Sequence, residues 1–561
     1  MERKLTGRPA SPGLYVGPAA VLSTVGGPAR TKGHPFDEQA ALRAAVAASL
    51  KELSALAAGA NGEARRIMGI QEALLEDEAL IEAALAAITR GEAADMAWRD
   101  SMAHEIAGYE AAEDEYFRAR AADLVDVRDR VLRHLTGGSP AYRAAPGTVL
   151  IAPDLPPSTF LSHDWSQGGA VVLAQGSTSS HVAMLARARG VPMVVGVDTD
   201  GRAEDILVVD GDSGLIITDP KPETLASVER RKAAAAHART EAQARVAEPA
   251  LTKDGTRIAV MINVATPDDL IGISPKSCDG IGLVRTEFLM ADGALRDEQR
   301  QFELYSRLVS WADARPVTIR TLDAGGDKPI PGYTVEGEKN PFLGLRGIRL
   351  SLRHRGVFRI QLRALARAAA LGPVKIMLPM VTKSQELAEA TELLDEVVFE
   401  LEREGASASR PQLGIMIEVP LAALAIDQFD AAFFSIGSND LVQYVTASSR
   451  DGKEGGQFGD VTHLGVLRLI AAVAAHGART GREVSLCGDA GADPHAIPAL
   501  LAAGVHTLSV APGLLAATKD AVRSVDLRRM AQPHLLPSWW DRLRSGFSSS
   551  AAKALFSGTT K

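Results

Sequence analysis

Residues 413–440 read LGIMIEVPLAALAIDQFDAAFFSIGSND, in which two short apolar runs, LGIMIE and FFSIG, flank a segment rich in Ala and Leu. Six more runs of this kind follow residue 250: RIAVMINV, GIGLVR, PVTIRTL, VKIMLPM, REVSLC and TLSV. Helical patterns such as DEQRQFELYSRLVSWADA lie between most of them. Continuous apolar runs are typical of parallel strands buried on both faces. Eight alternating strand and helix units over residues 250–535 therefore predict a TIM barrel.

Polar residues follow the ends of these runs, where a TIM barrel carries its active site. They are Arg285, Arg320, Glu418 and Cys487 at run ends, Asn439 and Asp440 after FFSIG, Arg346 in NPFLGLRGIR, and Arg450 beyond Asp440. Arginine forks suit a ligand with several phosphate and carboxylate charges. Carboxylates are hard oxygen ligands for Mg²⁺, and a thiol can donate a proton to an enolate. Any one of these residues could instead be an ordinary loop-surface residue, and Cys487 could be an ordinary core residue. The recurrence of polar residues at successive strand ends favours a common site.

The pattern of apolar residues before residue 250 is different. Residues 147–219 contain the short apolar runs TVLIA, GAVVLA, VPMVVGV, ILVVDG and GLIITD, which turn residues separate. Together with SPGLYVGPAAVL at 11–22, they predict a small α/β or β-rich layer. Residues 36–136 have no strand pattern, and periodic stretches such as EALLEDEALIEAALAAI indicate amphipathic helices. A helical block is therefore expected between the first strand and the rest of the layer.

A Gly/Ser/Thr run precedes a histidine in GSTSSHVAMLARARG, residues 176–190. Ser and Thr are good N-caps, and Gly190 suits the position that follows a helix. We expect His181 in the first turn of a short helix, where free N–H groups and the helix dipole favour a bound anion. The alternative is an ordinary helix with a structural histidine.

These sequence patterns divide the chain into five parts. We assign residues 1–32 and 138–222 to the α/β domain and 33–137 to the helical subdomain. Residues 223–249 are predicted to form a linker helix with little apolar content, and residues 250–535 are predicted to form the barrel. Residues 536–561 form a tail to which we assign no structure or function. The fold class is multidomain α/β with an inserted all-helical subdomain.

Composition limits the classes of function. Hydrophobic residues make up 46% and charged residues 23% of the chain, as in ordinary globular proteins. No apolar run reaches membrane-spanning length, the N-terminus shows no signal peptide, and the only two cysteines, Cys278 and Cys487, lie far apart. We therefore expect a cytoplasmic protein without disulfides or a Cys-based zinc site.

The charge is unevenly distributed. Residues 33–137 carry 20 acidic and 11 basic side chains, a net charge of −9, against −8 for the whole chain. Nucleic acid is therefore not expected as a partner, since it selects basic surfaces. The acidic segment is either the docking surface of a basic protein or a solvated helical face.

Seven stretches resemble Enzyme I of the bacterial phosphoenolpyruvate:sugar phosphotransferase system: SPGLYVG, GIGLVRTEFLM, IRTLDAGGDK, NPFLGLRGIRL, GIMIEVP, FFSIGSNDLVQY and CGD. The similarity extends from about residue 8 to about residue 530. The family fold that it implies is a phosphohistidine α/β domain with an inserted helical subdomain that binds the carrier protein HPr. A linker helix and a TIM barrel that binds phosphoenolpyruvate and dimerises follow.

The resemblance also implies roles for individual residues. His181 would take the phosphoryl group of phosphoenolpyruvate and pass it to a histidine of HPr, in the first step of sugar uptake. Glu418 and Asp440 would bind Mg²⁺, and Cys487 would protonate enolpyruvate to pyruvate. The residues implied to hold phosphoenolpyruvate are Arg285, Arg320, Arg346, Arg450 and Asn439, with Lys328 of GGDK lining the same site.

The chain departs from the family pattern at a few positions. The usual phosphohistidine stretch has a Gly pair, one residue, and then Thr-Ser-His, but this chain has Ser177 and Ser179 at the second Gly and the Thr. The chain also has Val182 where the family usually has a small residue, Val419 in place of a Thr, and Asp489 in place of a Glu. Since Ser keeps a hydroxyl, we expect these changes to affect the rate more than the reaction.

Three alternative functional interpretations are disfavoured. A pyruvate phosphate dikinase or phosphoenolpyruvate synthase needs an ATP-grasp domain, for which no segment has room. The nitrogen-related Enzyme I paralogue carries an N-terminal sensor domain, whereas here the SPG motif comes almost at once. A non-catalytic phosphoenolpyruvate sensor would need neither His181 nor Cys487.

Overall fold

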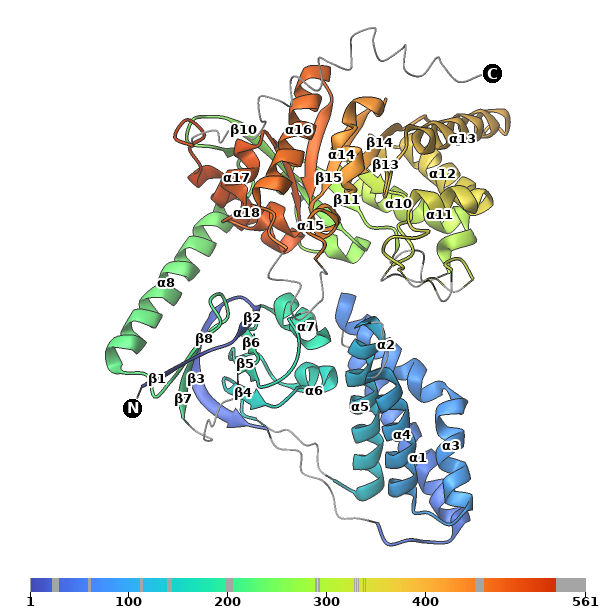
Figure 1. Cartoon of the computed structure of the whole chain (residues 1–561), viewed down its shortest axis with the longest axis vertical. Helices are drawn as coiled ribbons and strands as arrows, with labels where there is room; N and C mark the ends of the chain where they lie inside the picture. Colours follow the sequence, from blue (N-terminus) through green and yellow to red (C-terminus); the bar gives the residue numbers. More distant parts are fainter. Residues whose placement is uncertain are drawn as a thin grey trace, which may run out of the picture. The chain divides into compact units, whose positions relative to one another are not determined.

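The structure is a computed structural model that describes residues 2–22, 30–58, 62–110, 115–138, 144–178, 180–197, 205–287, 290, 293–326, 328, 330, 332–335, 338, 340–448 and 459–530. The chain forms two compact units, of which the first ends at Ala236 and the second begins at His237 (Figure 1). Each unit has its own sheet. Among the described residues, no helix has both the length and the apolar character that crossing a membrane requires.

Parallel strands of the second unit close into a barrel. They are β10 (Arg257–Val264), β11 (Ile281–Val284), β12 (Val317–Arg320), β13 (Val374–Leu378), β14 (Gln412–Ile417), β15 (Phe433–Gly437), β16 (Glu483–Cys487) and β17 (Thr507–Val510). Each pairs in parallel with the next, and β17 pairs with β10. The short β9 (Ala250–Leu251) adds an antiparallel pair to β10. The predicted TIM barrel is confirmed, and each of the eight apolar runs overlaps one of its strands.

Helices surround this barrel. They are α10 (Glu298–Ala312), α11 (Ile348–Arg353), α12 (Arg355–Ala369), α13 (Ser384–Arg403), α14 (Pro420–Leu424), α15 (Ser438–Thr446), α16 (Leu464–Thr480), α17 (Ile497–Ala502) and α18 (Leu515–Ser524). In β14, Ile415 and Ile417 belong to the large core shared with the helices, whereas Met416 belongs to a smaller cluster with Cys487. Because successive side chains of a strand point to opposite faces, this smaller cluster fills the barrel interior.

The sheet of the first unit combines residues from both ends of that unit. Its strands are β1 (Arg3–Thr6), β2 (Arg8–Ser11), β3 (Leu14–Val21), β4 (Val149–Ala152), β5 (Ala170–Leu173), β6 (Met193–Val195), β7 (Ile206–Asp210) and β8 (Leu215–Thr218), in the order β1-β8-β7-β3-β4-β5-β6-β2. Strands β3 to β6 are parallel, and the flanking strands are antiparallel. Helices α6 (Pro157–Ser162) and α7 (His181–Arg189) complete the layer.

A helical block is inserted between β3 and β4, as the sequence predicts. Its described helices are α1 (Pro35–Ala58), α2 (Gly62–Glu76), α3 (Glu78–Thr89), α4 (Ala94–Glu110) and α5 (Glu115–Thr136). Buried Glu38 fastens α1 to the start of α4, because its carboxylate accepts hydrogen bonds from the N–H of Ala94 at 2.7 Å and of Gly33 at 3.1 Å. The core of these helices continues into residues of α6 and α7, so the block is packed onto the α/β layer.

Helix α8 (Pro222–Ala244) lies where the linker helix is expected, and it ends before the predicted residue 249. Val228 near its start packs on Val208 and Ile217 of the first unit. Beyond its end, the carbonyls of Val246 and Glu248 accept hydrogen bonds from the Lys519 ammonium at 2.7 and 3.1 Å. The domain boundaries drawn from the sequence stay predictions.

Candidate active site

Arg346 is a fully buried cation at the barrel rim. It lies between β12 and α11, and its side chain is 0% exposed. Two of its nitrogens donate hydrogen bonds to the two carboxylate oxygens of Asp323, each at 3.0 Å, and two donate to those of Asp440 at 3.3 Å. Burial would lower the pKa of the guanidinium, but Asp323 and Asp440 raise it above its usual value. The group is therefore a permanently charged fork in a fixed orientation.

Arg320 is a second buried guanidinium at the same rim. It is the last residue of β12, donates a hydrogen bond to Glu287 at 2.9 Å, and lies 3.3 Å from Asp323. Burial alone would raise the pKa of the Asp323 carboxyl, but Lys328, Arg320 and Arg346 hold it well below its usual range. Lys328 joins the group through a hydrogen bond from its ammonium to Asp323 at 3.2 Å.

Glu418 follows β14 and faces this cluster. Its carboxylate accepts a hydrogen bond of 2.6 Å from the backbone N–H of Met380, whose φ of 58° lies in the left-handed region that non-glycine residues rarely adopt. Burial and the negative charges of Asp440 and Asp323 raise the pKa of Glu418 to about 8. Gly437 leaves room for this side chain, since a Cβ there would lie 2.9 Å from the Cβ of Glu418. The carboxylates at this rim are crowded, and a cation bound there would relieve their repulsion.

Cys487 ends β16 inside the barrel and is 2% exposed. Its sulfur accepts a hydrogen bond from the Ser435 hydroxyl at 3.4 Å, and burial raises the pKa of the thiol. The positive charges of Arg320 and of Arg285, which directly follows β11, lower the pKa of the same thiol and partly offset the effect of burial. The thiol is therefore protonated at neutral pH, in a position to act as an acid.

Asn439 is paired with Asp489, the residue that replaces the usual Glu of the family pattern. The side-chain N–H of Asn439 donates a hydrogen bond to the Asp489 carboxylate at 3.1 Å, and the backbone N–H of Asp489 donates one to Oδ1 of Asn439 at 3.1 Å. Asp489 therefore orients Asn439. Two predicted residues, Arg450 of the rim and Ser179 near His181, lie outside the described residues.

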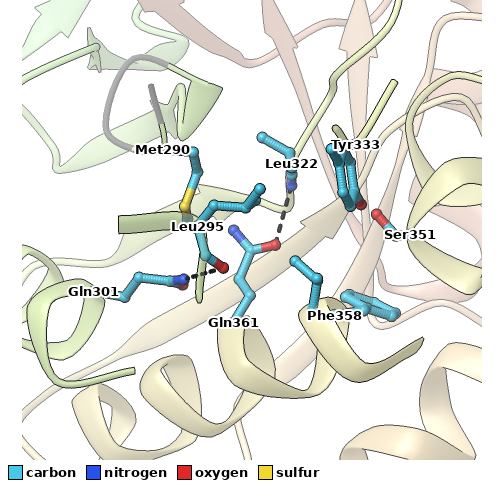
Figure 2. Close-up of a pocket in the computed structure, with 9 residues that line it drawn as sticks. Met290, Leu295, Gln301, Leu322, Tyr333, Ser351, Phe358 and Gln361 are labelled. Carbon is cyan, nitrogen blue, oxygen red and sulfur yellow. Dashed lines mark hydrogen bonds between the residues drawn. The ribbon is translucent and has the colours of Figure 1, made fainter. Parts of the chain in front are cut away.

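A network of uncharged groups supports the rim from behind. The side chain of Gln361 on α12 accepts a hydrogen bond from the N–H of Leu322 at 3.1 Å (Figure 2). Its amide N–H donates to the hydroxyl of Thr286 at 3.4 Å and to the hydroxyl of Tyr305 at 3.3 Å. The Thr286 hydroxyl in turn donates to the carbonyl of Arg320 at 3.0 Å. A cavity of about 10 Å³, enough for one water molecule, lies beside Gln361. Gln361 thus ties together the segments that follow β11 and β12.

Sequence reasoning missed Glu287, Asp323 and Gln361. The first two stand inside quoted motifs, GIGLVRTEFLM and IRTLDAGGDK, and an acid close to a strand-end arginine is a usable signal for an ion pair. Gln361 lies inside an amphipathic helix and offers no such signal. Among the described residues, no cluster of three or more His, Cys, Asp or Glu side chains has the arrangement of a complete metal site. Glu418 and Asp440 can supply only part of a coordination shell, which fits Mg²⁺ because it usually keeps waters and binds substrate oxygens.

His181 is the first residue of α7, so the predicted place in a first turn is confirmed. The Ser180 hydroxyl accepts a hydrogen bond from the N–H of Ala183 at 3.3 Å, and Gly190 ends the helix with a φ of 66°. The imidazole is 17% exposed, and its Nδ1 lies 3.3 Å from each carboxylate oxygen of Asp123 on α5. Nothing in the sequence signals Asp123, which stands in the inserted block. A partly exposed imidazole at the start of a helix can accept an anionic group.

Comparison with known proteins agrees with this architecture. Three domain families of phosphoenolpyruvate-utilising enzymes match the chain. They are the phosphoenolpyruvate-binding domain over residues 239–527, the N-terminal domain over 6–120 and the mobile domain over 144–214. A phosphoenolpyruvate-protein phosphotransferase of Geobacillus stearothermophilus is 36% identical over 550 residues, which cover 95% of this chain and 94% of the relative. One from Bacillus sp. (strain S) is 37% identical over 528 residues and 91% of each chain.

One solved structure, an NMR solution structure of an Enzyme I protein, is 27% identical, and the match covers 41% of this chain and 98% of that one, with a TM-score of 0.35. The assignment rests on the sequence matches, which extend over nearly the whole chain. The chain belongs to the phosphoenolpyruvate-protein phosphotransferases, the Enzyme I family of phosphoenolpyruvate-utilising enzymes.

Proposed function

We propose that this chain takes the phosphoryl group of phosphoenolpyruvate onto His181 and passes it to a histidine of a separate HPr-type carrier, releasing pyruvate, as the first step of sugar uptake. The observation that carries the proposal is the pair of buried guanidiniums, Arg320 and Arg346, which carboxylates hold at the strand ends of the barrel. Such a pair suits a ligand that bears both a phosphate and a carboxylate.

The rim binds and orients the substrate. Arg320 and Arg346 are held by Glu287, Asp323 and Asp440, so their charges need no reorganisation when an anion arrives. The other groups proposed to contact phosphoenolpyruvate are Arg285, Arg450, Asn439 and Lys328. Glu418 and Asp440 would hold Mg²⁺, which when bound neutralises charge on the phosphoryl oxygens.

The chemical step needs a nucleophile and an acid. The lone pair of His181 Nε2 forms a bond to phosphorus while the bond between phosphorus and the enol oxygen breaks. The enolate that remains takes a proton at carbon from the Cys487 thiol and becomes pyruvate. The positive charge of Arg285 and the Ser435 hydroxyl stabilise the thiolate left behind.

Onward transfer requires a docking surface for the carrier, and we assign it to the acidic helical block. Helix α2 contacts α7, so a carrier that presents its histidine to His181 also meets α2. Charge complementarity mainly speeds association, so Glu72→Gln with Glu76→Gln should slow transfer to the carrier, most at low salt, and leave labelling of His181 unchanged. Equal transfer rates for the variant and the parent at low salt would refute this assignment.

We also propose that the enzyme is a dimer through its barrel unit and works in the cytoplasm. The exposed apolar side chains of Leu421 and Leu424 on α14 support a partner surface on that unit. The two thiols, Cys278 and Cys487, are unpaired and buried, as suits a reducing compartment. Sedimentation of the chain with Leu421→Ser and Leu424→Ser tests the interface, since an unchanged dimer would place it elsewhere.

Labelled phosphoenolpyruvate tests the main proposal. With Mg²⁺, the chain should take up label in an acid-labile, alkali-stable bond, as expected of a phosphorus–nitrogen bond. His181→Ala should abolish the label, whereas His237→Ala, which removes an exposed histidine of α8, should keep it. An unlabelled parent chain, or a His181→Ala chain labelled like the parent, would overturn the proposal.

A further inference from the structure

The imidazole of His181 has a partner from the inserted helical block. Asp123 on α5 is fully buried, and its two carboxylate oxygens lie 3.3 Å from Nδ1 of His181. Among the described residues, Oδ2 of Asp123 accepts no hydrogen bond. Since a buried carboxylate oxygen without a donor is costly, a proton on Nδ1 of the imidazole is the group that satisfies it.

Asp123 itself is held in place. Gln71 on α2 donates a hydrogen bond to Asp123 at 3.4 Å and a second to Asp126 at 3.1 Å. Asp126 accepts further hydrogen bonds from the N–H of Ser158 at 3.1 Å and from its hydroxyl at 2.6 Å. Helices α2, α5, α6 and α7 therefore meet in one buried polar cluster that faces a single nitrogen of the imidazole.

We propose that Asp123 is the positioning residue of the phosphoryl-accepting imidazole: it keeps the proton on Nδ1 and so leaves the lone pair of Nε2 free for phosphorus. This inference rests on the function proposed above. An imidazole with its proton on Nε2 has no lone pair on the atom that must form the bond, so the choice of tautomer decides whether His181 reacts.

The carboxylate also serves the transfer itself. When Nε2 bonds to phosphorus and the enol oxygen leaves with its electron pair, the ring becomes a phosphorylated imidazolium with the proton still on Nδ1. Asp123 stabilises this positive charge across the Nδ1–H hydrogen bond, at a distance from the phosphoryl group. In the onward step the nitrogen–phosphorus bond breaks and the electron pair returns to Nε2. The Nδ1 proton stays in place in both directions.

Nitrogen-15 NMR of the imidazoles in the full, unphosphorylated chain tests the tautomer without any substrate. At a pH at which the ring is neutral, His181 should carry its proton on Nδ1. Asp123→Asn places an amide N–H within reach of Nδ1 and should shift the proton to Nε2. Asp129→Asn is the matched control, because Asp129 stands on the same helix, is 45% exposed and pairs with Arg128. A parent chain with the proton on Nε2, or an Asp123→Asn chain that keeps it on Nδ1, would overturn the proposal.

Kinetics provide the second measurement. Asp123→Asn should slow the labelling of His181 about 10- to 100-fold, as losses of partners that orient a histidine do. The KM for phosphoenolpyruvate should not change, because Asp123 does not belong to the unit that binds it. Asp123→Glu, which restores a carboxylate, should recover part of the rate, and circular dichroism checks that each variant is folded. A parent chain that takes no label contradicts the function, whereas a labelled parent with a full-rate Asp123→Asn variant contradicts only this inference.

Discussion

The barrel rim and the surroundings of His181 differ in how deeply their functional side chains are buried and in how many carboxylates contact them. At the rim, Arg346 is fully buried and bound on two sides by carboxylates, and Arg320 shares one of them. At the start of α7, a partly exposed imidazole contacts one carboxylate. The difference teaches that a substrate site benefits from rigid, desolvated charges, whereas a group that meets two partners in turn has to stay accessible.

The largest effect is expected at Arg346. Arg346→Lys keeps one charge but cannot serve Asp323 and Asp440 together, so we expect a loss in kcat/KM of about 1,000-fold, or roughly 4 kcal/mol. Steady-state pyruvate formation measures this loss. Arg359→Lys, on the partly exposed face of α12, is the control and should stay near the parent rate. A rate within about threefold of the parent for Arg346→Lys would mean that the fork is not part of the site.

The next effect concerns Cys487 and separates proton transfer from binding. Cys487→Ala removes the proposed acid but none of the rim charges, so pyruvate formation should slow by about 100-fold or more at an unchanged affinity for phosphoenolpyruvate. The chain has a matched control in Cys278→Ala, since Cys278 is also buried and unpaired. Equal rates in the two variants would remove Cys487 from the mechanism.

A smaller effect is expected behind the rim. Gln361→Leu leaves the buried N–H of Leu322 without its acceptor and removes the hydrogen bond donated to the hydroxyl of Tyr305, so the segment that carries Arg320 and Asp323 should loosen. We expect about a tenfold loss in kcat/KM and a loss of about 1–3 kcal/mol of stability, measured by urea unfolding. Gln299→Leu on the exposed face of α10 is the control. Full activity of Gln361→Leu would restrict the network to a structural role.

The smallest effect is expected at the other site. Ser180→Ala removes the side-chain cap of α7 and should cost about 1 kcal/mol, seen as faster hydrogen exchange in that helix. Labelling of His181 should slow only a few-fold, because Asp123 still orients the ring. If Ser180→Ala slowed labelling more than Asp123→Asn, the cap rather than the carboxylate would position the imidazole.

Much of the fold could be predicted because its signals are local. The apolar runs of the barrel each overlap a strand, and the Ser and Gly flanking His181 to Arg189 mark the ends of α7. Strand ends then place Arg320, Glu418 and Cys487 at one rim, since parallel strands of a barrel end at the same edge. The family motifs lie in these same segments.

The partners of these residues could not be predicted in the same way. Asp123 meets His181 only because α5 packs on the layer that carries α7. Gln361 meets Leu322 only because α12 packs against β13, the strand that pairs with β12. The sequence by itself determined the strands, the caps and the chemical types at the strand ends, because these follow from local hydrophobicity and backbone propensity. Only the tertiary structure decided which carboxylate or amide faces each of them, because hydrogen bonds depend on distances that long-range packing sets.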